Sequence, residues 1–420
     1  MGEVFEPLDP VDAQSLSLAR ETMSPVDARR WMPPIPKRVR TVSGSWWWRT
    51  GGRVQPGRSR VPARLRVPAR LRASGTTRIR HLREGGQSGH QRESAGVYPG
   101  AAGPVAAGVM DTANSSSLEG SVPSLASRVM PPLLTAFGYR HRFASPQATA
   151  ELVAARRLRP RAYGPPRVLP RGVDIGVDED GGWPLYEVRA SAGPGQRRIV
   201  YLHGGSWINQ ISPLHWQLIL RLAADTGSRI LVPIYPLAPQ GTAASVVPHV
   251  ADLLRRLAAA HGAGNVSVVG DSAGGQIALS AALLLRDLGV ALAHTVLISP
   301  ALDLSLRNPA IDVLEAQEKW LVRPGLRAAA DLCRDGLRWE EPIVSPLFGQ
   351  MAGLGPLAVF AGTRDITHPD CELLVSKARA AGVHTEFHQA KGMVHVYPLL
   401  PIPEGRAARR TMARILGEEP

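Results

Sequence analysis

The chain has 420 residues, enough for one large domain or two, and 44% of them are hydrophobic, which can supply a substantial core. Its formal net charge of +14 is concentrated at one end, because residues 1–109 hold 18 Lys and Arg against 8 Asp and Glu. Two cysteines exclude a disulfide-framed fold, and the sequence has no run of about 18 apolar residues that would predict a spanning helix. We therefore expect a cytoplasmic protein with an ordinary charge balance beyond residue 109.

The first quarter of the chain is rich in arginine and proline. Residues 28–83 contain 16 basic and no acidic residues, and they have too few large aliphatic side chains for a folded domain. We expect residues 1–109 to be a disordered extension, either a dispensable tail or sequence upstream of a true start at Met110. The alternative is an arm that binds nucleic acid, with Trp46–Trp48 stacking on bases, and a salt-dependent affinity would distinguish it. We expect no nucleic-acid partner.

Beyond residue 120, segments with strand and helix patterns alternate. Apolar residues at helical spacing predict the helices, and short buried apolar runs predict the strands. The expected elements are, in chain order, helices 122–139 and 146–158, an antiparallel pair of strands 173–177 and 185–188, strand 198–202, helix 212–225, strand 229–235, helix 244–260, strand 265–270, helix 273–287, strands 294–299 and 357–362, helix 368–382, strand 384–389 and helix 403–416. This alternation predicts an α/β fold over residues 120–418, with a mostly parallel sheet covered on both faces.

The motif with the clearest chemistry is Gly270-Asp-Ser-Ala-Gly274, which matches G-x-S-x-G between a buried strand and a helix. That context is typical of a nucleophile elbow, in which a strained turn exposes the serine beside a helix N-terminus. Gly270 and Gly274 would let the strand and the helix approach closely. We predict that Ser272 is a nucleophile and not a residue of a plain tight turn.

A second motif, Tyr201-Leu-His-Gly-Gly-Ser-Trp207, follows a strand about 70 residues earlier. Consecutive glycines there can turn backbone N–H groups toward a carbonyl oxygen. We predict an oxyanion hole formed by the amides of Gly204 and Gly205 together with that of Ala273. His203 is expected to brace this loop and not to carry protons.

These motifs resemble those of the hormone-sensitive-lipase-like family of α/β-hydrolases, bacterial esterases with an HGG oxyanion motif and a GDSAGG elbow. The resemblance covers about residues 120–418, and further matches are Tyr235-Pro-Leu-Ala-Pro239, Leu297-Ile-Ser-Pro-Ala-Leu-Asp303, Val344-Ser-Pro-Leu-Phe348 and Gly392-Met-Val-His395. The chain departs from the family at Ser206, which stands where a third glycine is usual. The family also implies a helical cap over the site, here from residues 121–160 and about 301–345. Trp207, Trp216 and Trp320 are candidates to line an acyl or alcohol pocket, and each could equally belong to the core.

The triad order in this fold is serine, acid, histidine. Position at a strand end and the family pattern both favour Asp365 as the acid, with Asp303 as its rival and Asp370 as an early helix residue. For the histidine we favour His395, which lies in a loop after the last strand. The other candidates are less suitable, because His384 and His388 belong to a strand and His368 begins a helix.

The resemblance implies a serine carboxylesterase that hydrolyses esters with short to medium acyl chains through an acyl-enzyme, with no metal or cofactor required. Three alternatives stay open. The same triad would serve a lactonase or an amide hydrolase, and the fold also occurs in ligand-binding proteins that have lost the histidine. The expected partner is a small ester, and a homodimer is compatible with the sequence.

Overall fold

The structure is a computed structural model in which residues 46–47, 98, 123–128, 141, 143–191, 195–318 and 320–417 are described. The chain forms two compact units, Met1–Trp47 and Trp48–Pro420. The first contains the two-residue strand β1 (Trp46–Trp47), and all other described elements belong to the second. Apart from residues 46–47 and 98, the expected extension over residues 1–109 lies outside the described residues.

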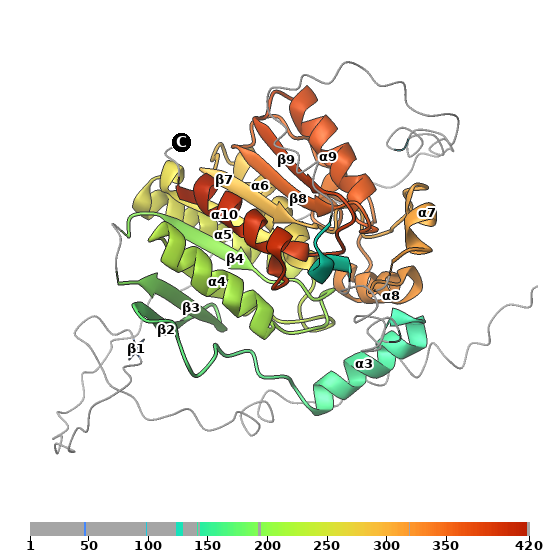
Figure 1. The fold of residues 1–420 in the computed structure, drawn as a ribbon, viewed down its shortest axis with the longest axis horizontal. Helices are drawn as coiled ribbons and strands as arrows, with labels where there is room; N and C mark the ends of the chain where they lie inside the picture. The colour runs from blue at the N-terminus through green and yellow to red at the C-terminus, as the bar shows by residue number, and fades with distance from the viewer. Residues whose placement is uncertain are drawn as a thin grey trace, which may run out of the picture. The chain divides into compact units, whose positions relative to one another are not determined.

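The second unit is built on a twisted, mostly parallel sheet (Figure 1). Its strand order is β2-β3-β5-β4-β6-β7-β8-β9, and only the pairs β2–β3 and β3–β5 are antiparallel. The bounds are β2 (Val173–Asp180), β3 (Trp183–Ala190), β4 (Arg198–Leu202), β5 (Arg229–Pro233), β6 (Val266–Asp271), β7 (His294–Ile298), β8 (Leu357–Gly362) and β9 (Thr385–Ala390). All six residues of β6 and of β8 are buried, as expected for central strands covered on both faces.

Helices cover both faces of this sheet and divide the core into two clusters. Helices α4 (Pro213–Thr226) and α10 (Pro403–Gly417) lie side by side on one face, in front of the sheet in Figure 1. The other face is covered by α5 (Ala243–His261), α6 (Ala273–Asp287) and α9 (His368–Ala380). This is the mostly parallel sheet, covered by helices on both faces, that the sequence predicts.

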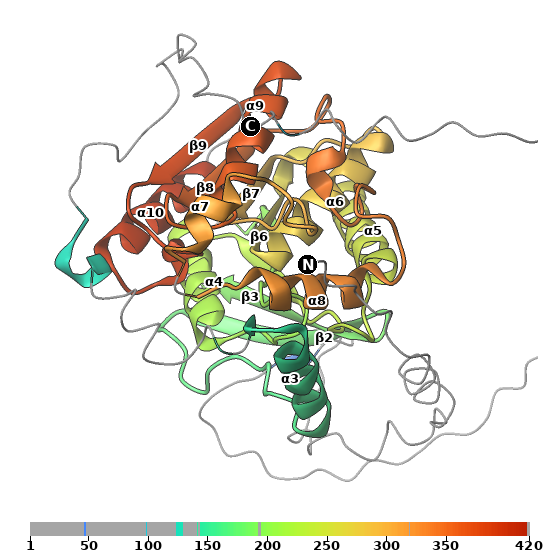
Figure 2. The ribbon, with the colours of Figure 1, turned by 90° about the vertical axis from the view of Figure 1, so that its right-hand side faces the viewer.

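The remaining helices come from the two regions expected to form a cap. Helix α3 (Pro146–Leu158) packs against α8 (Arg323–Arg334), as Figure 2 shows, and α7 (Ile311–Glu315) precedes α8. The Thr149 hydroxyl donates to the Gly325 carbonyl at 3.2 Å, and a side chain at Gly325 would collide with the backbone of Phe143. Segments about 175 residues apart are thereby joined.

The predicted and observed elements differ mainly at their ends. Strands β2 and β3 each have eight residues, longer than predicted, because the whole hairpin pairs in register from Val173 with Ala190 to Asp180 with Trp183. Most of the helix expected over residues 122–139 lies outside the described residues, which have helical backbone only over 125–128. None of the helices in the described ranges combines the length and the apolarity that crossing a bilayer requires.

Candidate active site

Ser272 occupies the sharp turn between β6 and α6. Its backbone has φ 52° and ψ −118°, a conformation that costs a non-glycine residue of the order of 1–3 kcal/mol and persists only where the surroundings enforce it. Its N–H donates to the Ile298 carbonyl at 2.9 Å, and its own carbonyl accepts from the Ala301 N–H at 3.0 Å. A side chain at Gly274 would collide with the Leu202 carbonyl, so this glycine allows the close approach that the sequence predicts.

Two side chains from distant loops are linked to Ser272: His395 contacts the serine, and Asp365 contacts His395. The His395 Nε2 atom lies 3.0 Å from the Ser272 hydroxyl oxygen, and the His395 Nδ1 atom lies 2.9 Å from an Asp365 carboxylate oxygen. Asp365 follows β8 and His395 follows β9, so neighbouring parallel strands bring both residues to the same edge of the sheet. The structure therefore brings together all three residues that the sequence singles out for a triad.

The charges around this set are arranged to favour a proton on the histidine. Burial alone would raise the pKa of the fully buried Asp365, but His395 and hydrogen bonds from Thr367 and Ser299 hold that pKa below its usual range. Burial alone would lower the pKa of His395, but Asp365 and Glu318 outweigh it and raise that pKa. A Ser–His pair with this polarity can transfer a proton from the hydroxyl to the ring.

The loop after β4 lies next to the serine and is shaped by its glycines. A side chain at Gly204 would collide with the Asp271 carboxylate, and Gly205 has φ 129°, a conformation that favours glycine. Ser206, in place of the family's third glycine, adopts φ 54°, and Trp207 adopts φ 63°. Positive φ values occur both in this loop and at Ser272, which indicates that the surrounding fold fixes the backbone of the site.

His203 is fully buried and braces that loop. Its Nδ1 atom lies 2.7 Å from the Gly204 carbonyl, and its ring stacks on Tyr235 with centroids 4.5 Å apart. The Tyr235 hydroxyl donates to the His203 carbonyl at 2.6 Å. Burial lowers the pKa of His203 to about 4, so this ring is neutral at physiological pH. These contacts suit the bracing role expected from the sequence.

A buried polar network behind the loop is absent from the sequence predictions. The Tyr201 hydroxyl donates to one Asp271 carboxylate oxygen at 2.7 Å, and the His215 Nε2 atom lies 3.1 Å from the other. The His215 Nδ1 atom in turn contacts Ser212 at the start of α4. Asp271 lies inside the elbow motif, but nothing in the sequence indicates that His215 reaches it from a helix 56 residues away.

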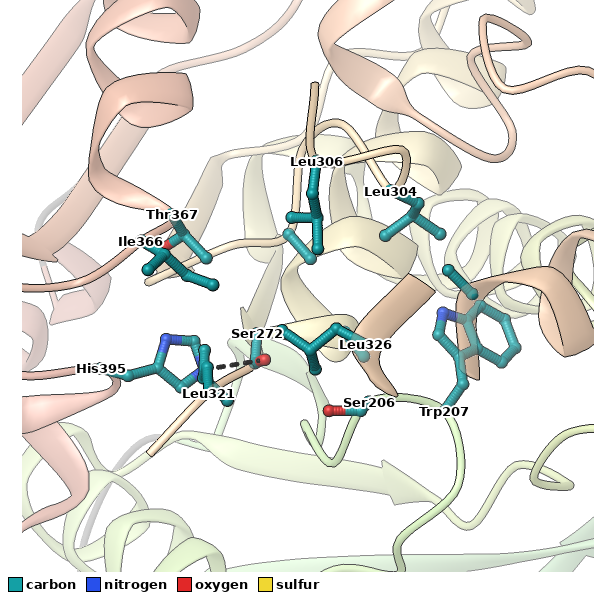
Figure 3. Close-up of a pocket in the computed structure, with 13 residues that line it drawn as sticks. Ser206, Trp207, Ser272, Leu304, Leu306, Leu321, Leu326, Ile366, Thr367 and His395 are labelled. Carbon is teal, nitrogen blue, oxygen red and sulfur yellow. Dashed lines mark hydrogen bonds between the residues drawn. The ribbon is translucent and has the colours of Figure 1, made fainter. Parts of the chain in front are cut away.

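A pocket opens in front of Ser272 and His395, with about 480 Å³ of free space including its mouth (Figure 3). Ser206 and Ala273 also line it, and Figure 3 shows the Ser206 hydroxyl directed toward the side where Ser272 lies. The walls are mainly aliphatic and come from the expected cap and from the loop after β8, with Leu304, Leu306, Leu321, Leu326, Ala330 and Ile366. Such a lining suits an uncharged acyl or alcohol group.

Of the three tryptophans considered for this pocket, only Trp207 lines it, with its indole N–H bound to Gln276 at 3.1 Å. Trp216 instead belongs to the core on the opposite face of the sheet, where its N–H donates to the Tyr163 carbonyl. Trp320 packs against the His395 ring and does not line the pocket.

The rival acids and histidines lie in other contacts. Asp303 accepts hydrogen bonds from Ser305 and from the Tyr98 hydroxyl, and Asp370 accepts one from Asn308. None of the three rival histidines, His368, His384 and His388, is linked to Ser272. His368 lies 2.9 Å from Gln389, His388 stacks on Phe360, and His384 precedes β9. Tyr98 belongs to the expected extension over residues 1–109, yet it packs against the core of the second unit.

The chain is similar in sequence to known hydrolases. A family profile described as alpha/beta hydrolase fold matches residues 199–399. A triacylglycerol lipase from Mycobacterium tuberculosis is 35% identical over 211 residues, which are 50% of this chain and 44% of that lipase. The chain therefore spans less than half the length of this relative. An acetyl-hydrolase from Streptomyces hygroscopicus is 34% identical over 218 residues, which are 50% of this chain and 72% of that protein.

The fold is also similar to that of a solved structure. An esterase from the bacterial hormone-sensitive lipase family superposes with a TM-score of 0.56 at 25% identity, over 65% of this chain and 97% of that chain. The residues that the family profile matches include the loop after β4, the turn at Ser272 and the two loops that carry Asp365 and His395.

Proposed function

Because the chain belongs to the hormone-sensitive-lipase-like family of carboxylic ester hydrolases with the α/β-hydrolase fold, we propose that it is a serine carboxylesterase with Ser272, His395 and Asp365 as its triad. The observation that carries the proposal is the pair of contacts at 3.0 Å and 2.9 Å that link the three side chains in front of an apolar pocket. That arrangement is the one required for acyl transfer.

In the proposed reaction, neutral His395 accepts the Ser272 hydroxyl proton while the serine oxygen attacks the ester carbonyl carbon. Asp365 holds the imidazole with its Nδ1–H toward the carboxylate and stabilises the imidazolium that forms. Collapse of the tetrahedral intermediate breaks the bond to the alcohol, which leaves with the proton from His395. Water then attacks the acyl-enzyme, with His395 again accepting and returning a proton.

We assign the oxyanion hole to the backbone N–H groups of Gly204, Gly205 and Ala273. Ala273 is the first residue of α6, where the helix dipole favours a developing negative charge, and the two glycines allow the loop to approach Ser272 closely. Ser206 supplies a side chain where the family usually has none, so we expect it to shape the part of the pocket next to the reacting carbonyl.

The substrate class follows from the pocket. Five large aliphatic side chains line the pocket, so we propose uncharged acyl chains of short to medium length as its substrates rather than charged acids. We further propose that the two regions joined by α3 and α8 form a cap, because α8 contributes Leu326 and Ala330 to the pocket wall.

A panel of p-nitrophenyl esters tests the substrate class. We expect kcat/KM to be highest among acetate to octanoate and to fall for palmitate, because longer chains exceed the pocket. A serine-directed organophosphonate should abolish hydrolysis with one equivalent bound. Absence of turnover on every ester, together with cleavage of a lactone or an amide, would contradict the proposal.

We propose that the protein acts in the cytoplasm. Its two cysteines, Cys333 and Cys371, are both buried and free, and burial raises the pKa of each thiol, which keeps them unreactive. Such cysteines are typical of a reducing compartment. Fractionation of the native host, followed by immunoblotting, would test this location.

A further inference from the structure

A second carboxylate, Glu318, lies close to the triad and has no part in the steps described above. Its side chain is buried, with the whole residue 1% exposed, in the segment between α7 and α8. The backbone N–H of Trp320 donates to a Glu318 carboxylate oxygen at 2.7 Å. Because burying a carboxylate is unfavourable without compensating interactions, a glutamate at this place requires an explanation.

The segment folded around Glu318 contacts the triad directly. The Trp320 ring meets the His395 imidazole edge to face, with centroids 5.9 Å apart and an angle of 88° between the planes. Leu321, the next residue, lines the pocket. The hydrogen bond to Glu318 therefore fixes both a neighbour of the histidine ring and part of the substrate wall.

Three acidic residues act on the charge of His395. Asp365 after β8, Glu318 in the cap segment and Asp271 at the end of β6 each raise the pKa of His395, in that order, against the lowering effect of burial. Burial and Asp365 raise the pKa of Glu318, while His395 lowers it. Glu318 and His395 therefore stabilise each other when both are charged.

We propose that Glu318 is a positioning residue that acts through His395: its carboxylate holds Trp320 against the imidazole and adds a second negative charge that favours the imidazolium formed when Ser272 attacks. This inference rests on the proposed function, since the imidazolium forms only in that reaction cycle. It assigns the buried carboxylate a role distinct from that of Asp365, which contacts the ring nitrogen directly.

The inference predicts a specific change in pH dependence. Because His395 must be neutral to accept the serine proton, kcat/KM rises as the pH increases through the pKa of His395. Removing the charge of Glu318 lowers that pKa, so the acidic limb of the kcat/KM profile moves to lower pH. On the alkaline plateau the same change slows turnover, because the imidazolium is less stabilised.

The test compares Glu318→Gln with Glu318→Asp and Glu315→Gln. For Glu318→Gln we expect the acidic limb to move down by about one pH unit and the plateau kcat/KM to fall about tenfold. Glu318→Asp keeps the negative charge, so the acidic limb of its kcat/KM profile should lie closer to that of wild type. Glu315 is the matched control, because this nearby carboxylate at the end of α7 pairs with Arg323 at 2.9 Å, and its change should leave the limb in place.

A titration without substrate separates this inference from the proposed function. The protein has 12 histidines, so the Cε1 signal of His395 in ¹³C-labelled protein is assigned by its loss in His395→Gln. We expect its midpoint to be lower in Glu318→Gln than in wild type. An unchanged midpoint in a folded Glu318→Gln, or an equal shift in Glu315→Gln, would overturn the inference. Absence of ester hydrolysis in wild type would overturn the proposed function while this titration still decided the role of Glu318.

Discussion

The residues around Ser272 share a backbone feature that is unusual for their types. Ser206, Trp207, Ser272, Ser299 and Val396 all have positive φ values without being glycine. Each such conformation is unfavourable by itself, and their concentration at one end of the sheet indicates that packing enforces them. The fold therefore holds the serine, the loop beside it and the loop of His395 in one fixed geometry.

The assignment of the acid can be tested against its rival. Both Asp365 and Asp303 are fully buried, but only Asp365 contacts His395. We expect Asp365→Asn to lower kcat by a factor on the order of 10⁴, because an asparagine favours the wrong imidazole tautomer. Asp303→Asn should retain at least a tenth of wild-type turnover. A reversed order in p-nitrophenyl butyrate assays, with both variants folded by circular dichroism, would show that the acid is wrong.

At the residue scale, the sequence predicts those site residues that belong to short motifs or follow predicted strands. Ser272, Asp365 and His395 follow from a motif, a strand end and a loop, and the structure places all three in contact. Glu318 and His215 reach the site from segments without a motif, because burial and contact depend on how distant helices pack. For Trp216 the sequence left a pocket wall and the core equally open, and the structure places this residue in the core on the opposite face of the sheet.

At the scale of elements, helix α8 supplies two residues of the pocket wall. Leu326 and Ala330 lie one turn apart, so they share the face of α8 that lines the pocket. Arg327, between them, is exposed on another face. The pocket wall therefore includes residues of α8 and is not formed by the triad loops alone.

A larger side chain at Leu326 should shorten the accepted acyl chain. We expect Leu326→Trp to lower kcat/KM for p-nitrophenyl octanoate at least tenfold more than for the acetate, since filling a pocket excludes methylene groups worth about 1–3 kcal/mol in discrimination. Arg327→Trp provides the control on the same helix. Equal losses on both esters would show that Leu326 does not border the acyl chain.

The strand order of the sheet was not predicted, although its parallel character was. Alternating strand and helix patterns imply crossover connections, whereas the position of β4 between β5 and β6 depends on long-range pairing. The extra length of β2 and β3 has the same origin, because it comes from the pairing of two strands and not from their own residues. Local patterns contain no information on either feature.

At the scale of the whole molecule, the role of residues 1–109 and a homodimer remain predictions. Of the described residues of this segment, Tyr98 packs against the core and its hydroxyl donates to Asp303, which precedes the pocket residues Leu304 and Leu306. Asp303 also accepts hydrogen bonds from the backbone and the hydroxyl of Ser305. Its loop therefore has supports that do not depend on Tyr98.

A chain that starts at Met110 should keep kcat/KM within tenfold of the full chain, because every triad residue and its contacts lie beyond residue 200. Tyr98→Phe in the full chain separates the single contact to Asp303 from the rest of the segment. A chain that starts at Ser145 loses Phe143, which packs against Gly325 of α8, and should lose activity and melt lower. A loss above tenfold for the Met110 chain, about 1.4 kcal/mol in transition-state stabilisation, would show that the segment contributes to the site.

The most direct test of the central claim is the turnover of p-nitrophenyl butyrate by Ser272→Ala beside wild type, with trapping of the acyl-enzyme by acid quench and peptide mass analysis. Removal of the nucleophile is expected to lower kcat by a factor on the order of 10⁴ to 10⁶ while the melting temperature stays close to that of wild type. In wild type, the butyryl group should be found on the peptide that contains Ser272. Turnover by Ser272→Ala above a tenth of wild type, or a butyryl group on another residue, would contradict the account.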